Sequence, residues 1–183
     1  MLQAWISSRD PVEVTGSQFI SPLIVHQFVA AASVGGEEVA EICLKAGQVL
    51  LRKFKQSGLL GFPIYIAPAV AEAHWTLLVL RKIGSRVDIR YYDSLTEEVV
   101  INRTVADDIC SFMRKSLPEF QFPEVLPVRE NKRSRQSNGV DCGVFAMYFW
   151  EGELRRWIGE GWSLPFPQTS QKGPIYKFRC RLV

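Results

Sequence analysis

The sequence predicts a single α+β domain in which helices pack on a sheet of short strands. Segments whose apolar residues recur at helical spacing alternate with short strand-like runs, and glycine or proline separates them. The chain has 183 residues, of which 47% are hydrophobic and 22% are charged. A chain of this size and composition can bury a full core without disulfide or metal support. We therefore expect one domain over residues 1–183.

The first clear helix is expected over residues 37–56, after an irregular N-terminal stretch. Ser57 and Gly58 follow it as a stop signal. The apolar residues at helical spacing are Val39, Ile42, Cys43, Ala46, Val49, Leu50 and Phe54. Such a stripe is typical of a helix that covers one face of a sheet.

Three strand-like runs follow, over residues 63–68, 74–80 and 86–92. The second run is almost wholly apolar, which indicates a strand buried on both faces, whereas the third alternates apolar and polar residues and should bury one face. The Gly84-Ser85 turn is short enough to join these two runs as a hairpin. The start of one strand then lies beside the end of the next, which places His74 near Asp93.

A further helix is predicted over about residues 105–117, with apolar residues on one stripe. Two prolines then introduce an extended piece over residues 125–129, and a polar, basic loop covers residues 130–138. From Cys142 the chain turns helical again. The apolar face of this last helix is too wide for a surface helix, so we expect it at the centre of the core. In the tail, residues 159–183, only a short strand over residues 175–178 is expected.

Charge and motifs exclude several classes of function. The net charge is +3, from 22 basic and 19 acidic residues, which is too mild to indicate a nucleic-acid-binding protein. Four basic residues near the polar loop are interpreted as solvated charges or as a docking patch for an acidic partner; they are Arg129, Lys132, Arg133 and Arg135. No phosphate-binding glycine motif occurs, so no nucleotide cofactor is expected.

The chain also lacks the marks of a membrane or secreted protein. There is no run of about 18 apolar residues and no signal-peptide pattern at the N-terminus, which favours an intracellular protein of the nucleus or cytoplasm. The four cysteines are Cys43, Cys110, Cys142 and Cys180. They are scattered, and the chain has only two histidines, so we expect reduced thiols and no metal site.

Cys142 is the candidate nucleophile, because a polar loop runs into a helix that begins at this cysteine. Free backbone N–H groups and the positive end of the helix dipole stabilise a thiolate there, most strongly with a histidine nearby. His74 can serve as the base, and Asp93 can hold its tautomer and orientation. Gln136 is the candidate side-chain donor to an oxyanion.

In this order, the residues resemble the Ulp1-like cysteine proteases of the adenain-like clan, which process SUMO and related modifiers. The shared elements are His74-Trp75, then Asp93, then a QxNGxDCGxF stretch that ends at Phe145. The resemblance implies a papain-like cysteine protease fold, with the cysteine on a helix against a central mixed sheet, and a catalytic core over about residues 63–158. It also implies Cys142 as nucleophile and His74 as general base and later acid. It assigns the orienting carboxylate to Asp93 and the oxyanion donor to Gln136.

The resemblance further implies a substrate that ends in Gly-Gly, held in a narrow tunnel. Trp75 matches the tryptophan that lines this tunnel in the family. Gly139 and Gly143 allow the loop to turn and the backbone to approach the substrate, and Asn138 and Asp141 shape that loop. The expected partner is SUMO first, then NEDD8 or ubiquitin, and their conjugates. A second tryptophan that the family uses as a lid is poorly matched here by Trp5.

Two other functions use the same residues. The first is a catalytically silent module that binds a ubiquitin-like partner, and the second is an acyltransferase that passes an acyl group to a hydroxyl or amine. All the catalytic positions hold competent side chains, which argues against the silent module. Asp93 and the QxNGxDCG stretch favour the protease over the acyltransferase.

Overall fold

The computed structural model describes residues 16–33, 37–66, 74–95, 100–125 and 142–159. Within these ranges lies a sheet of four strands in the order β1-β2-β3-β4. The strands are β1 (Ser17–Phe19), β2 (Leu59–Ile66), β3 (His74–Ile83) and β4 (Arg86–Asp93). The helices are α2 (Pro22–Ser33), α3 (Glu37–Gln56), α4 (Val100–Ser116) and α5 (Cys142–Trp157). The β1–β2 pair is parallel and the other pairs are antiparallel, so the sheet is mixed, as predicted.

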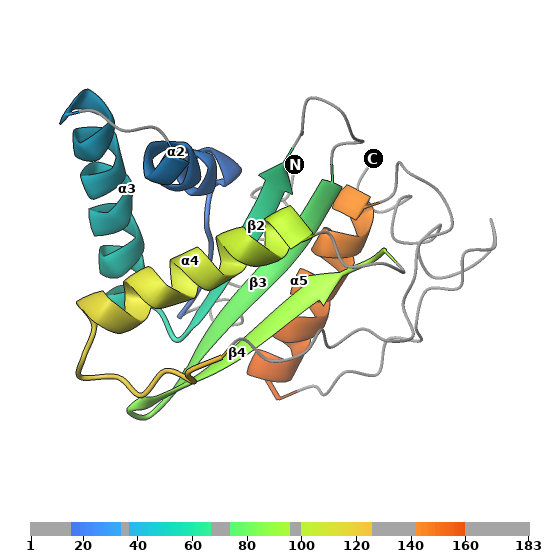
Figure 1. Ribbon diagram of the computed structural model, residues 1–183. Helices are drawn as coiled ribbons and strands as arrows, with labels where there is room; N and C mark the ends of the chain where they lie inside the picture. The colour runs from blue at the N-terminus through green and yellow to red at the C-terminus, as the bar shows by residue number, and fades with distance from the viewer. Residues whose placement is uncertain (1–15, 34–36, 67–73, 96–99, 126–141, 160–183) are drawn as a thin grey trace.

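The sheet separates two hydrophobic cores. Helices α2, α3 and α4 cover one face, and α5 covers the other (Figure 1). Leu78 and Leu80 of β3 point into the first core, whereas Leu77 and Val79 point into the second. The strand is therefore buried on both faces, which confirms the prediction from its apolar run. The helix that begins at Cys142 is likewise largely buried, as its wide apolar face indicated.

The hairpin and the first predicted helix are confirmed. Helix α3 spans the predicted residues, and β3 pairs with β4 through the Gly84 turn, where the backbone φ of 61° suits glycine. Strand β2 begins at Leu59, four residues before the predicted start. Pro63 interrupts the pattern that would have revealed it. Proline lacks the N–H that a strand donates to its neighbour. The pairing of β1 with β2 ends at Gly61, so at Pro63 there is no β1 residue left to accept such a hydrogen bond.

The described part of the N-terminal stretch, residues 16–33, is not irregular, so the prediction is wrong for these residues. Residues 17–19 form β1, and α2 follows directly. The backbone carbonyl of Ser21 accepts hydrogen bonds from the N–H groups of Ile24 and Val25, and Pro22 occupies the first helical position, where its lack of an N–H costs nothing. Helix α4 likewise begins at Val100, about five residues before the predicted start. The first residues of this helix are mostly polar, so the apolar spacing did not reveal them.

Several predicted segments lie outside the described residues. They are residues 126–129 of the extended piece, the basic loop over residues 130–138 and the tail strand over residues 175–178. In the part of the chain that is described, no helix is long and apolar enough to cross a bilayer.

Candidate active site

Three element ends meet at one end of the sheet. Strand β3 begins with His74, β4 ends with Asp93, and α5 begins with Cys142 (Figure 1). All three residues are buried, with exposed fractions of 4% for His74 and Cys142 and 0% for Asp93. The chain therefore places a thiol, an imidazole and a carboxylate together from three separate elements.

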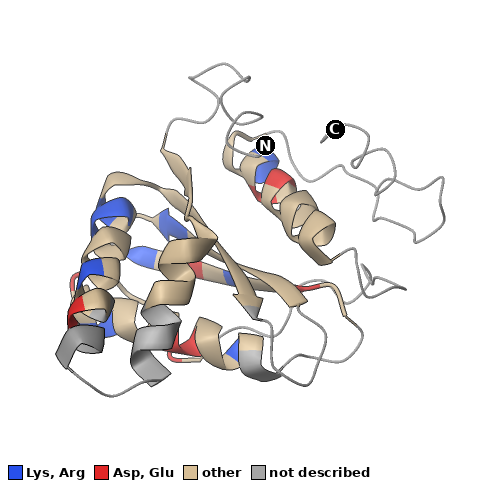
Figure 2. Ribbon diagram, turned by 90° about the horizontal axis from the view of Figure 1, so that it is seen from above, with Lys and Arg blue, Asp and Glu red and all other residues tan. Residues whose placement is uncertain are grey.

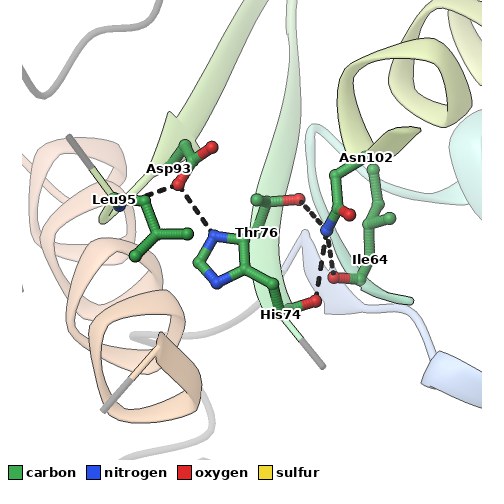
Figure 3. Close-up of polar contacts among 6 residues, drawn as sticks. All are labelled: Ile64, His74, Thr76, Asp93, Leu95 and Asn102. Atoms are coloured by element: carbon green, nitrogen blue, oxygen red, sulfur yellow. Dashed lines mark hydrogen bonds and ion pairs between the residues drawn. The ribbon is translucent and has the colours of Figure 1, made fainter. Parts of the chain in front are cut away.

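The hairpin brings His74 and Asp93 into direct contact. His74 Nε2 and Asp93 Oδ1 are 2.8 Å apart (Figure 3). In the strand register Asp93 stands opposite Thr76, two residues beyond His74, so the imidazole reaches along the strand to the carboxylate. The same Asp93 oxygen accepts the backbone N–H of Leu95 at 2.9 Å, which fixes the carboxylate. The predicted proximity of His74 and Asp93 is confirmed.

Cys142 completes this chain of contacts. Its sulfur lies close to the His74 side chain and to the backbone N–H groups of Trp75 and Gly143. Burial by itself raises the pKa of the thiol, but the interactions with these groups and the histidine charge outweigh it and lower the pKa below the usual value. The position at the start of α5 adds the helix dipole in the same direction.

The pKa of His74 shifts in the opposite direction from that of Cys142. Burial lowers the pKa of His74, but the hydrogen bond to Asp93, then the one to Cys142, and the charges of both raise it to about 9. A thiol with a lowered pKa beside an imidazole with a raised one holds its proton on the imidazole at neutral pH. The arrangement can therefore supply a thiolate and an imidazolium to a substrate.

A second set of hydrogen bonds holds the backbone of His74. Asn102, in the first turn of α4, donates from Nδ2 to the carbonyl oxygen of His74 at 3.2 Å, to Thr76 Oγ1 at 3.2 Å and to the carbonyl oxygen of Ile64 at 3.4 Å (Figure 3). Asn102 was not predicted from the sequence. The feature that could have identified it is its helical spacing to the buried face of α4, three residues before Val105 and seven before Ile109.

Trp75 lies against the start of α5. Its ring packs at a tilt against Tyr65 of β2, with centroids 4.5 Å apart and an interplanar angle of 33°. A Cβ atom added to Gly143 would lie 3.5 Å from the Trp75 ring, so the two predicted substrate-binding residues are neighbours. The other predicted site residues lie outside the described residues; they are Gln136, Asn138, Gly139 and Asp141.

The far half of α5 has a structural role. Its charged residues all follow Trp150 in the sequence, and residues 142–150 carry none (Figure 2). Glu153 is buried and accepts hydrogen bonds from Tyr92 and Arg156, which ties α5 to β4.

Among the described residues, no group of three His, Cys, Asp or Glu side chains is arranged to hold a metal ion.

Comparison with known protein families matches residues 10–156 to the Ulp1 protease family, C-terminal catalytic domain. A search of curated protein sequences finds no match. Among solved structures, the chain is similar to the Xanthomonas campestris effector protein XopD bound to ubiquitin. The TM-score is 0.63 at 21% sequence identity, and the alignment covers 98% of this chain and 83% of that one.

Two further structures are similar. A mutant of Xanthomonas XopD has a TM-score of 0.59 at 17% identity, with 99% of this chain and 90% of that chain covered. The C-terminal Ulp1 protease domain in complex with Smt3, the yeast orthologue of SUMO, has a TM-score of 0.46 at 16% identity, with 85% and 62% covered. The XopD structures share the fold described above. Because the family match spans most of the sequence, this chain belongs to the Ulp1 protease family and is a cysteine peptidase.

Proposed function

We propose that this protein hydrolyses the bond after the C-terminal Gly-Gly of a ubiquitin-like modifier. Cys142 is the nucleophile, His74 is the general base and acid, Asp93 orients His74, and Gln136 donates to the oxyanion. The observation that carries the proposal is the buried hydrogen-bonded series from Asp93 through His74 to Cys142 at a helix start.

The first half of the reaction forms an acyl-enzyme. The Cys142 thiolate attacks the carbonyl carbon of the terminal glycine, and a C–S bond forms as the carbonyl oxygen becomes an oxyanion. His74 is hydrogen-bonded to Asp93 through Nε2, so its other ring nitrogen, Nδ1, is left for the sulfur and the leaving group. The imidazolium gives its proton to the leaving amine, the C–N bond breaks, and a thioester remains.

The second half releases the modifier. The now neutral imidazole takes a proton from a water molecule, which attacks the thioester carbonyl. The C–S bond breaks, the modifier leaves with a free carboxylate, and the thiolate–imidazolium pair is restored. Asp93 stabilises the imidazolium in the resting enzyme and in the two tetrahedral intermediates, without itself taking up the proton.

The contact between Trp75 and Gly143 supports a substrate tail without side chains. A half-buried indole packed against the helix start leaves little room beside the nucleophile, and Gly-Gly is the tail that needs least room. SUMO is the first candidate modifier, in keeping with the family. Ubiquitin, which the similar XopD structure contains, and NEDD8 are the others.

We further propose that residues 1–183 act as one domain inside the cell, in the nucleus or cytoplasm. The described elements all pack on one sheet, which supports a single unit. A reducing compartment keeps a thiolate nucleophile from oxidation.

Turnover of C-terminal aminocoumarin amides of SUMO, NEDD8 and ubiquitin tests the proposal. The wild-type chain should release the fluorophore from at least one of them, and Cys142→Ala and His74→Ala should abolish release. Cys110→Ala is the matched control, because Cys110 is a buried thiol on α4 outside the site. Activity that survives in Cys142→Ala would overturn the assignment.

The same assay separates the two other functions. Tight binding of a modifier by the wild-type chain without release would indicate a silent binding module. Release that depends on an added amine or alcohol, with the modifier recovered on that acceptor, would indicate an acyltransferase.

A further inference from the structure

The peptide group between His74 and Trp75 has a polar neighbour on each side. Its carbonyl oxygen, which belongs to His74, accepts from Asn102 Nδ2 at 3.2 Å (Figure 3). Its N–H, which belongs to Trp75, lies close to the sulfur of Cys142 and helps to lower the pKa of that thiol. The described chain contains no cis peptide bond, so these two groups point in opposite directions from one rigid plane. Asn102 and Cys142 are therefore linked through a single peptide unit.

This peptide unit lies on the part of β3 that pairs with β2 alone. His74 is the first residue of β3, and the pairing of β3 with β4 starts only at Thr76. The N–H of Trp75 is thus beyond the ladder with β4 and is available to the sulfur. Asn102 compensates on the other side, since the same amide group also holds Ile64 of β2 and the Thr76 hydroxyl.

Asn102 is placed for donation. The residue is 0% exposed, and the two protons of its amide group are shared among three acceptors. Its carbonyl oxygen Oδ1 is buried and has no hydrogen-bond partner among the described residues. Leaving a buried acceptor unpaired is unfavourable, so an apolar residue of the same size would serve packing alone better.

We propose that Asn102 is a positioning residue of the active site, which fixes the His74–Trp75 peptide group so that the imidazole of His74 and the N–H of Trp75 both meet the Cys142 sulfur. The proposal rests on the assignment of Cys142 and His74 made above. Asn102 itself does not touch the reacting atoms; it acts through the backbone. A hydrogen bond to a peptide carbonyl also polarises the unit and strengthens its N–H as a donor.

Within the described ranges, few charges compete with this effect. The titratable groups there that influence the sulfur and the imidazole are Asp93 of β4 and the two residues themselves. The neighbour of Asn102 on α4, Arg103, is engaged with the Tyr91 ring at 5.4 Å and with Asp107. A change in thiol reactivity on substitution of Asn102 can therefore be traced to the peptide link.

The test compares Asn102→Leu with Val105→Ala. Both changes lie on the buried stripe of α4, but only the first removes the donor. The rate of Cys142 alkylation by iodoacetamide is measured from pH 5 to pH 10. In Asn102→Leu we expect the midpoint of thiolate formation to rise by about half to one pH unit and kcat/KM to fall about tenfold. In Val105→Ala the midpoint should match that of the wild type, even if its melting temperature falls as much as that of Asn102→Leu.

An equal midpoint in Asn102→Leu and Val105→Ala would overturn the positioning role. If Cys142→Ala and His74→Ala leave activity intact, it is the proposed function that fails instead. Should Asn102→Leu not fold, the wild-type chain still provides a test. In protein labelled with [15N]tryptophan, the Trp75 amide signal, assigned with Trp75→Phe, should shift with the same midpoint as Cys142 alkylation. A Trp75 amide signal that does not titrate would refute the link.

Discussion

Substitution of Asp93 by asparagine removes one negative charge with little change in shape. An asparagine oxygen can still accept from His74 Nε2 and from the Leu95 N–H, so the geometry of the site should survive. What is lost is the attraction between the carboxylate and the imidazolium. We therefore expect the protonated form of His74 to become less stable, and the His74 pKa to fall, while the fold is retained.

The magnitude follows from the pKa of His74. Despite burial, which lowers it, that pKa is raised from 6.5 to about 9, with the hydrogen bond to Asp93 as the largest favourable contribution. A difference of about 2.5 pH units corresponds to about 3 kcal/mol of net stabilisation of the imidazolium. If Asp93 supplies more than half of it, Asp93→Asn should lower the His74 pKa by more than one unit and kcat/KM by about 10- to 100-fold at pH 7.

Histidine NMR measures this directly, because the chain has only two histidines. The Cε1–H signal of His74 is titrated in the wild type and in Asp93→Asn, with the exposed His26 as an internal reference. A wild-type His74 that titrates near 6.5, or one that still titrates near 9 in Asp93→Asn, would refute the reasoning.

The same shift predicts how stability depends on pH. A histidine whose pKa is higher in the folded than in the unfolded chain contributes stability that is fully present below pH 6.5 and is lost as the pH rises through about 9. The difference in unfolding free energy between the wild type and Asp93→Asn should therefore be larger at pH 6 than at pH 10. Urea denaturation at both pH values tests this, and a difference that grows with pH would contradict it.

Three further changes have distinct expected results. Iodoacetamide at pH 7 should modify Cys142 well before Cys110, since burial raises the pKa of the Cys110 thiol to about 12; equal rates by peptide mass mapping would count against a reactive Cys142. Gln136→Ala should lower kcat by about 10²- to 10³-fold if Gln136 donates to the oxyanion, and an unchanged kcat would remove it from that role. Gly61→Ala should destabilise the fold by about 1–3 kcal/mol, because the new Cβ would lie 2.6 Å from the buried Trp150 ring; thermal unfolding would show no loss if the ring can move aside.

The contact between His74 and Asp93 could be predicted because it depends on local rules. A two-residue turn with glycine aligns two strands, and alternation of apolar residues sets which parts of them are buried. The start of α5 at Cys142 was also readable, since a polar loop gives way there to a continuous apolar helix. These features need only short-range sequence information.

The elements that were missed depend on tertiary contacts. Strand β1 has three half-buried residues and is defined only by its pairing with β2. Helix α2 is so uniformly apolar that no helical period separates it from a buried loop, although Ser21 and Pro22 mark its start. Asn102 looked like an ordinary polar helix residue, because its acceptors on β2 and β3 are 26 to 38 residues away in the sequence.

The central claim is that Cys142 is the nucleophile that attacks the carbonyl after Gly-Gly. The most direct measurement is reaction of the pure protein with SUMO, NEDD8 and ubiquitin that carry a C-terminal electrophile, followed by intact-mass and peptide mapping. The account predicts one adduct per chain, mapped to Cys142, with at least one of the probes, and no adduct in Cys142→Ala. An adduct at another cysteine, or no adduct with any probe, would contradict it.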